Sequence, residues 1–319
     1  MSKKCRQRGS WISGALLALL LLAGCQGDGQ AETGKLQVVA TTGLIGDAVR
    51  QVAGDQVELD VLMGPGVDPH LFSASEGDVA RLQQADLIFY NGLLLEAQLA
   101  SVLQRLGERK PAVAVAEQLD PDLLLGVGVD GEFDPHIWFD LTLWQQVVEV
   151  IAAQLAAADP ANAAVYHANA SAYQAELTTL HTYVLERTAA LPAQQRILVT
   201  AHDAFRYFGR AYGFEVHGLQ GTSTVAEAGT ADLRALADLI VQKEVPAIFV
   251  ENSVPVRTVE AVQAAVRDRG HQVALGGELY SDALGPPNSA GATYAGLIRH
   301  NIDTIAAALQ GKESEDGEP

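Results

Sequence analysis

Short apolar runs alternate with amphipathic stretches along most of the chain. The apolar runs are rich in β-branched residues and predict strands, and the stretches between them have the spacing of helices. Strands are predicted at residues 36–41, 57–62, 87–90, 112–116, 196–200, 215–219, 247–250 and 272–275. Helices are predicted at residues 42–53, 75–84, 96–106, 204–212, 230–243, 258–269 and 294–309. This alternation predicts an α/β fold with parallel sheets.

The middle of the chain has a different pattern. Between Asp159-Pro160 and Leu191-Pro192 there is no internal proline or glycine. Asp before Pro is a typical helix start. One apolar stripe at helical spacing follows, made of Tyr166, Tyr173, Leu177, Leu180 and Val184. A continuous helix here would be about 45 Å long at about 1.5 Å per residue. We therefore predict a linking helix at 159–192 between α/β lobes at 36–158 and 193–311.

The N-terminus predicts an exported, lipid-anchored protein. Four basic side chains precede an apolar run that is too short for a stable membrane span. The run ends in Leu22-Ala23-Gly24-Cys25, which resembles the lipobox of bacterial lipoproteins. This resemblance implies a signal peptide at 1–24 and an acyl chain on Cys25 that holds the protein at a membrane. The alternative is an ordinary cleaved signal followed by an unrelated cysteine.

Composition limits the partners of the mature chain. The formal charge is −18, and loss of the basic signal makes it more acidic, which disfavours nucleic acid and attracts cations. Only Cys25 would remain after cleavage, so no disulfide is expected. The polar segment 25–35 predicts a flexible tether, and the charged segment 312–319 predicts a disordered tail. We expect a monomer.

Four side chains are candidates for a metal site. The tripeptide Asp-Pro-His occurs twice, ending at His70 and His136, and its proline stiffens the loop that presents each imidazole. His202 follows the predicted strand 196–200, and Asp282 follows the strand 272–275 by a few residues. Ligands of parallel α/β sheets bind at the carboxyl ends of the strands. All four candidates are therefore expected in loops around one cleft between the lobes.

Three imidazoles and one carboxylate suit Zn²⁺ and tolerate Mn²⁺ or Fe²⁺. Because an imidazole must be neutral to bind a metal, we expect the affinity to fall below about pH 6.5. A single histidine is more often a satisfied polar residue than a ligand, and we assign the remaining histidines to packing or to the surface. They are His167, His181, His217, His271 and His300.

The chain resembles a known family over nearly all of its mature length. The matching stretches are GPGVDPHLF (64–72), ADLIFYNG (85–92), FDPHIWFD (133–140), VTAHDAFRYFGRAYGFEVHGLQG (199–221) and LYSDALG (279–285). They resemble the TroA-like, or cluster A-I, metal receptors of bacterial ABC importers. The resemblance implies two (βα) lobes joined by a rigid helix, with His70, His136, His202 and Asp282 as ligands in the cleft between them. It also implies delivery of the ion to a membrane permease driven by an ATPase.

The resemblance does not decide whether the receptor prefers zinc or manganese. Many family members thought to prefer manganese have Glu at the third ligand position, where this chain has His202. Zinc-dedicated relatives often have a His-rich acidic loop before the second ligand, and residues 117–133 contain acid but no histidine. On raw affinity, Zn²⁺ should bind more tightly than Mn²⁺ to such a set of ligands.

Three other functions were weighed against the receptor. A zinc-dependent hydrolase needs an open coordination position and a nearby base, and no HExxH pattern occurs. Asp203 is interpreted as a structural or supporting residue, and Glu251 as a polar group at a strand end. The residues neither support nor exclude a role as a surface adhesin. The importer's own ATPase or permease is excluded because the chain has no GxxxxGK[ST] motif and, by our reading, no second apolar run near 18–20 residues.

Overall fold

The computed structural model describes residues 34–128 and 131–311. The described residues from Lys35 onward belong to one compact unit. The predicted signal peptide, Cys25, nearly all of the tether and the charged tail lie outside the described residues. The structure confirms the predicted fold class, an α/β protein with parallel sheets and a long helix.

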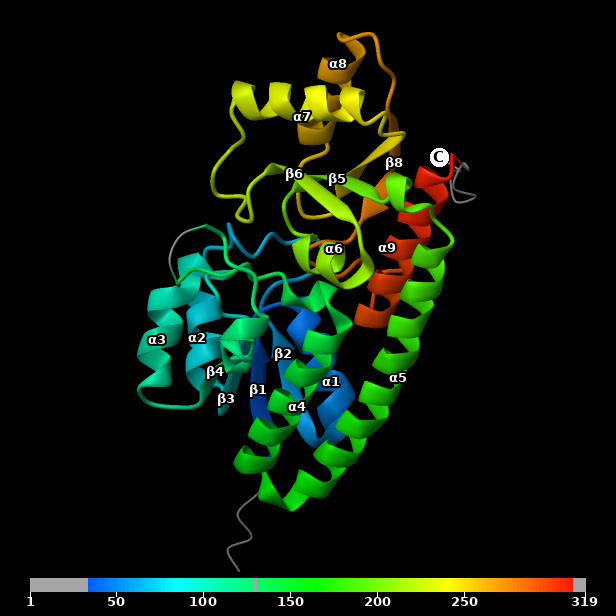
Figure 1. The fold of residues 1–319 in the computed structure, drawn as a ribbon. Coiled ribbons are helices and arrows are strands. Elements are labelled where there is room, and N and C mark those ends of the chain that lie inside the picture. Colours follow the sequence, from blue (N-terminus) through cyan, green and yellow to red (C-terminus); the bar gives the residue numbers. More distant parts are fainter. Residues whose placement is uncertain (1–33, 129–130, 312–319) are drawn as a thin grey trace, which may run out of the picture. The chain divides into compact units, whose positions relative to one another are not determined.

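The first half contains a four-stranded parallel sheet in the order β2-β1-β3-β4 (Figure 1). Its strands are β1 (Leu36–Ala40), β2 (Val57–Val61), β3 (Leu87–Tyr90) and β4 (Ala112–Ala114), and its helices include α1 (Gly43–Ala53), α2 (Glu76–Gln84) and α3 (Ala100–Gly107). Side chains alternate along β1. Val38 and Ala40 join the core that contains α1, whereas Val39 joins a separate core with Leu82 of α2 and Leu103 of α3. Helices therefore cover both faces of the sheet.

The second half is built from two parallel strand pairs. One pair is β5 (Ile197–His202) with β6 (Glu215–Gln220), and the other is β7 (Ala247–Glu251) with β8 (Ala274–Leu279). Strands β5 and β7 lie side by side. Helices α6 (Arg206–Tyr212), α7 (Thr230–Gln242) and α8 (Arg257–Arg267) connect these strands. The carboxyl ends of β5, β7 and β8 therefore lie at the same edge.

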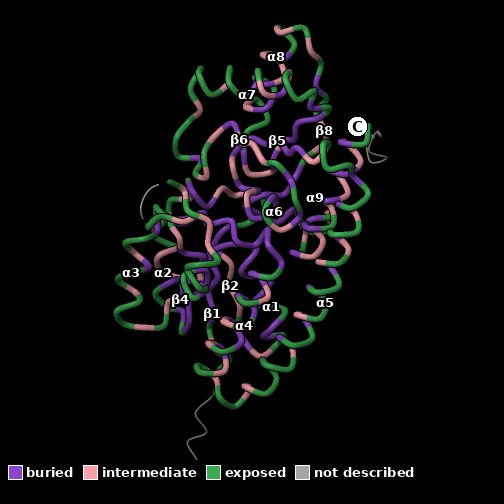
Figure 2. The backbone as a smooth tube through the Cα atoms, viewed as in Figure 1, coloured by how far each residue is buried: buried purple, intermediate pink, exposed green. Residues whose placement is uncertain are grey.

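The long helix α5 (Ala163–Ala189) packs against α1 and α4 (Leu141–Ala158) in the first half and against α9 (Tyr294–Leu309) in the second. Its predicted apolar stripe is buried along its whole length (Figure 2). The helical segment starts at Pro160, as predicted, with a 3₁₀ turn at Pro160–Asn162 that leads directly into α5. The Asp159 carboxylate before it accepts hydrogen bonds from the Asn162 amide and the Tyr166 hydroxyl. The exact lobe boundaries stay a prediction.

Helix α4 was missing from the predicted elements. Its 18 residues are long and apolar enough to cross a membrane, so the statement that no second run approaches this length was wrong. Buried side chains such as Trp144 and Ile151 pack in the core, and the Gln145 amide donates hydrogen bonds to the Gln174 carbonyl and the Thr178 hydroxyl of α5. These contacts are those of a core helix in a globular protein.

All four strands of the second half end beyond their predicted ends, β6 and β7 by one residue each and β5 and β8 by more. Strand β5 continues to His202, so this candidate lies in a strand and not in a loop. Strand β8 begins at Ala274 and runs through Gly276 and Gly277 to Leu279, four residues beyond the predicted region of 272–275. Glycine is a poor strand former, and here the pairing with β7, which has an irregular register, outweighs that local preference.

The buried face of α5 gives a stability prediction. Leu177→Ala should lower the free energy of unfolding by about 2–5 kcal/mol, because Leu177 is fully buried and its removal leaves a cavity. Leu185→Ala on the same helix is the matched control, since Leu185 is 43% exposed. Urea denaturation of both variants measures the difference. Equal losses of stability would contradict the burial of the stripe.

Candidate metal centre

The first Asp-Pro-His tripeptide lies in the loop after β2. The Asp68 carboxylate accepts a hydrogen bond from the His70 backbone N–H at 2.8 Å, so the tripeptide is a local turn with the carboxylate at its centre. The imidazole of His70 is 2% exposed. A buried ring in a stiff turn has few alternative positions, which favours a defined ligand geometry.

The second tripeptide repeats this turn and adds a contact to the ring. The Asp134 carboxylate accepts from the His136 backbone N–H at 3.0 Å, and the same oxygen lies 2.7 Å from Nδ1 of His136. The Tyr207 hydroxyl of α6 donates to the Asp134 carbonyl at 3.0 Å. When Nδ1 of His136 donates its proton to Asp134 in a hydrogen bond, Nε2 of the neutral ring keeps a free lone pair, which can bind a cation.

His202 is held in the same way from the second half. Its Nδ1 lies 2.6 Å from a carboxylate oxygen of Glu251, and its backbone N–H donates to the other oxygen at 2.9 Å. Glu251 ends β7, the strand beside β5. Asp282 follows β8, and the Trp138 indole N–H of the first half donates to the carbonyl of the preceding Ser281 at 3.0 Å. The ends of neighbouring strands therefore position the imidazole of His202 and the carboxylate of Asp282.

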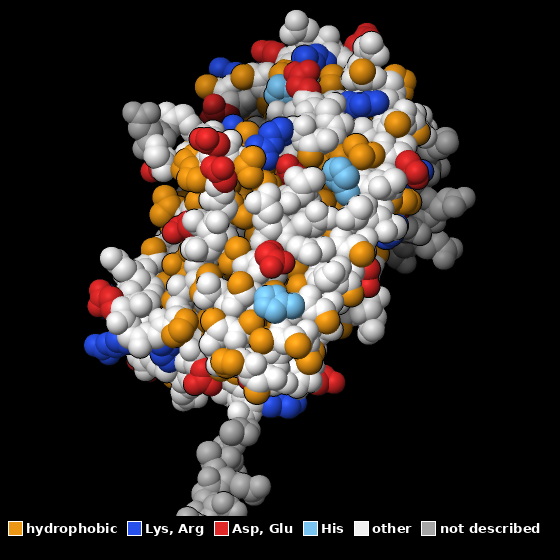
Figure 3. All heavy atoms as spheres, turned by 60° about the horizontal axis from the view of Figure 1, so that its bottom comes forward, with side chains coloured by type: hydrophobic (Ala, Val, Ile, Leu, Met, Phe, Trp, Pro, Cys, Tyr) orange, Lys and Arg blue, Asp and Glu red, His pale blue; other side chains and the backbone are white. Residues whose placement is uncertain are grey.

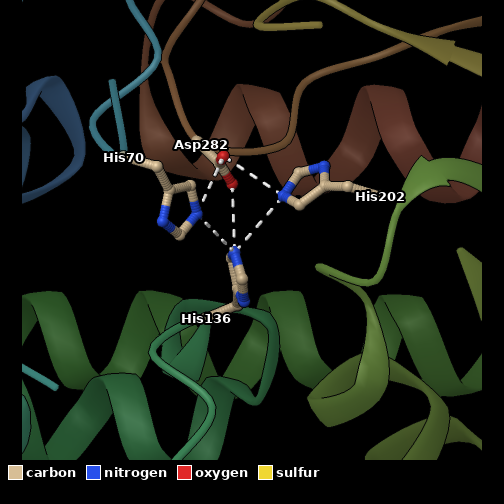
Figure 4. A group of neighbouring side chains, drawn as sticks. All are labelled: His70, His136, His202 and Asp282. Carbon is tan, nitrogen blue, oxygen red and sulfur yellow. Dashed lines mark hydrogen bonds and ion pairs between the residues drawn. The ribbon is translucent and has the colours of Figure 1, made fainter. Parts of the chain in front are cut away.

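The four predicted side chains converge on one point (Figure 4). The Nε2 of His136 lies 3.4 Å from that of His70 and 3.3 Å from that of His202. Oxygens of Asp282 lie 3.2 Å from His202 Nε2, 3.5 Å from His136 Nε2 and 3.7 Å from His70 Nε2. In a tetrahedral site with bonds of about 2.0–2.1 Å, ligand atoms are about 3.3–3.4 Å apart. The arrangement has the size of a tetrahedral zinc shell.

The Asp282 carboxylate supports a cation at the centre. It is 1% exposed, and its oxygens lie 3.2–3.7 Å from the Nε2 atoms of the three imidazoles. A buried anion is strongly unfavourable unless a positive charge compensates it, and a bound cation or a protonated His202 can do so. The donor set of three nitrogens and one carboxylate is one that zinc sites use, and manganese tolerates it.

Residues 38–308 match the family model described as the zinc-uptake complex component A, periplasmic. The chain belongs to this ZnuA family. It is 44% identical over 301 residues to the manganese-binding lipoprotein MntA of Bacillus subtilis, covering 94% of this chain and 98% of the relative. It is 49% identical over 279 residues to the zinc-binding protein TroA of Treponema pallidum, covering 88% and 90%. A solved TroA structure from that organism superimposes with a TM-score of 0.85, covering 86% of this chain and 99% of the other.

The four candidate ligands differ in their state of charge. Burial lowers the pKa of His70 to about 4, so its ring is neutral at physiological pH. Burial also acts to lower the pKa of His202, but the carboxylates of Glu251 and Asp282 raise it well above its ordinary value. Burial alone would raise the pKa of Asp282, and the surrounding imidazoles hold it below the ordinary value instead. Without an ion, the site therefore contains one anionic carboxylate and a protonated His202.

Sequence reasoning missed the residues that orient the rings. Glu251 was interpreted as a strand-end polar group, and the structure shows it in direct contact with both Nδ1 and the backbone N–H of His202. Asp134 was read only as part of a stiff turn, yet it also contacts the ring of His136. Asp203 lies next to His202, and its carboxylate is 3.7 Å from Arg206. A carboxylate at the end of a strand beside a His-terminated strand was the available signal for Glu251.

The other histidines lie away from the four-residue group. His181 contacts the Tyr212 hydroxyl, His217 contacts Glu215, and His300 contacts the backbone carbonyl of Glu278. His167 and His271 are also outside the group. These positions agree with their assignment to packing and surface roles.

Proposed function

We propose that this chain is the extracytoplasmic receptor of an ABC importer, which captures one Zn²⁺ or Mn²⁺ ion through His70, His136, His202 and Asp282 and passes it to a membrane permease. The observation that carries the proposal is the convergence of three ring nitrogens and a buried carboxylate at tetrahedral spacing. Membership of the ZnuA family supports it, as do the names of relatives that bind zinc or manganese.

We infer that the site accepts both metals and holds zinc more tightly. Three imidazole nitrogens favour zinc over manganese on raw affinity. Both oxygens of Asp282 face the imidazoles, so the carboxylate can bind through one or both and extend the shell for a metal that prefers more ligands. One close relative is named for manganese and another for zinc, so similarity to them does not select one metal.

A receptor fits the site better than a zinc hydrolase does. Catalytic zinc keeps an open position for water and substrate, whereas four protein ligands complete a tetrahedral shell. All four side chains are at most 2% exposed, which leaves little access for a peptide or ester. The relatives are named as binding proteins and lipoproteins of transporters, and nothing in the site favours an adhesin.

The remaining assignments complete the proposal. Cys25 is the acylated residue that anchors the protein to the outer face of a membrane, as in the relatives that are named lipoproteins. The partners are the permease and its ATPase, and the protein works as a monomer. Nucleic acid is not a partner, in line with the net charge of −18 and with the scattered charges of both signs on the face in Figure 3.

Metal content and competition titration of the form lacking residues 1–25 test the proposal. We expect one ion per chain, with zinc displacing manganese. Failure to bind either ion would overturn the proposal, and metal-dependent hydrolysis of an ester or peptide would favour the hydrolase.

Metal binding should release a proton at neutral pH. The raised pKa keeps His202 protonated in the metal-free site, and the ion must displace that proton, whereas His70 is already neutral. Affinity should therefore rise with pH until the pKa of His202 is passed and fall as pH decreases, with a further loss near pH 4 when His70 gains a proton. Calorimetry in buffers of different ionisation enthalpy should show about one proton released per ion. A pH-independent affinity would contradict this charge assignment.

A further inference from the structure

Several hydrogen bonds join the two halves beside the metal centre, and two groups of them differ in how deeply they are buried. One set is deeply buried: the Trp138 indole donates to the Ser281 carbonyl, and the Tyr294 hydroxyl donates to the Trp138 carbonyl at 2.6 Å. Trp138 is 1% exposed and Tyr294 is fully buried. The other is a contact between two loops: the Thr224 hydroxyl donates to the Asp68 carboxylate at 2.6 Å.

Thr224 differs from its neighbours in the segment between β6 and α7. Residues 221–229 are exposed or half-buried except Thr224, which is 7% exposed. Its hydroxyl points across to the first half, where it meets one oxygen of Asp68. The other oxygen of Asp68 accepts from the His70 backbone N–H. A single carboxylate therefore connects the His70 turn to a loop of the opposite half.

This contact is accessible, unlike the buried one. A cavity of about 550 Å³ lies against it, and its lining includes Asp68, Thr224, Leu71, Ser253 and Arg257. Water can compete for the Asp68–Thr224 hydrogen bond at this cavity, whereas the Trp138 contacts are packed on all sides. The two halves can thus separate first on the Thr224 side, with the Trp138 contacts still in place.

We propose that Thr224 is a positioning residue that retains the bound ion by latching its loop to Asp68 and thereby holding His70 in place. The proposal rests on the proposed receptor function. Leaving the site requires His70 to move away from the ion, and the latch opposes that movement. Because the hydrogen bond holds the two halves together and so opposes opening of the site, it should mainly slow dissociation and affect association little.

The test is zinc dissociation from the full mature chain, followed by stopped flow with an excess of a chromophoric chelator. Thr224→Val removes the hydroxyl and keeps the shape, and it should speed dissociation about tenfold, equivalent to about 1.4 kcal/mol. The association rate should change less than about twofold. Thr224→Ser keeps the hydroxyl and should restore slow release. Thr222→Val is the matched control on the same segment and should leave both rates unchanged.

A double-mutant cycle distinguishes a latch from a general loosening of the loop. In an Asp68→Ala background, Thr224→Val should have no further effect on dissociation, because its partner is already gone. Unchanged release from Thr224→Val, equal acceleration by Thr224→Ser, or additive effects in the cycle would each overturn the latch. If the unmodified protein binds no metal, the receptor function itself fails. If it binds metal and Thr224→Val releases it at the normal rate, only the latch fails.

Discussion

His136→Ala should lower zinc affinity at least about 100-fold and leave the fold intact. The Nε2 of His136 is the most central ligand atom, within 3.3–3.5 Å of the other three. A four-ligand zinc site contributes about 10–16 kcal/mol, or roughly 3 kcal/mol per ligand, which corresponds to a loss of at least about 100-fold. Competition titration against a chromophoric chelator measures this loss.

His217→Ala is the matched control for this prediction. His217 is half-buried on β6 and contacts Glu215, away from the metal centre. Its removal should leave zinc affinity unchanged. Thermal unfolding of both metal-free variants should show that neither has lost its fold. A His136→Ala protein with normal affinity would remove His136 from the site and refute the assigned ligand set.

Glu251→Gln should lower zinc affinity about 10–100-fold, although Glu251 is not itself a proposed ligand. The amide has nearly the same shape, but its NH₂ group would face Nδ1 of His202. That ring nitrogen would then accept a hydrogen bond, and the neutral ring would carry its proton on Nε2, which faces the other three candidate ligands. Binding would require the ring to change tautomer or turn away.

Asp203→Asn is the control for this second prediction. Asp203 is adjacent to His202 in sequence and is half-buried, and its carboxylate lies near Arg206 and not against the ring. We expect nearly normal affinity for this variant. Proton release on zinc binding should also fall for Glu251→Gln, because loss of the carboxylate removes a cause of the raised pKa of His202. Equal affinities for the two variants would show that Glu251 has no orienting role.

Local signals in the sequence predicted most elements well. Helix α9 has its predicted bounds, and Thr42, Ser75 and Thr293 cap the helices that follow them with their side chains. Side-chain hydrogen bonds at helix starts and hydrophobic periodicity act over a few residues, so they can be read directly from the chain. Helix α4 was missed although its buried residues Trp144, Val148, Ile151 and Leu155 keep helical spacing.

The sequence by itself determined the types of the candidate ligands, their placement near strand ends, and the alternation that specifies an α/β fold. Only the tertiary structure decided how far apart the ligand atoms lie, that Glu251 and Asp134 orient two of the rings, and that Asp68 meets Thr224. Asp134 and His136 share one loop, but the other pairs join loops and strand ends that are far apart in the chain. Their distances follow from the packing of sheets and helices, whereas local preferences act only between near neighbours.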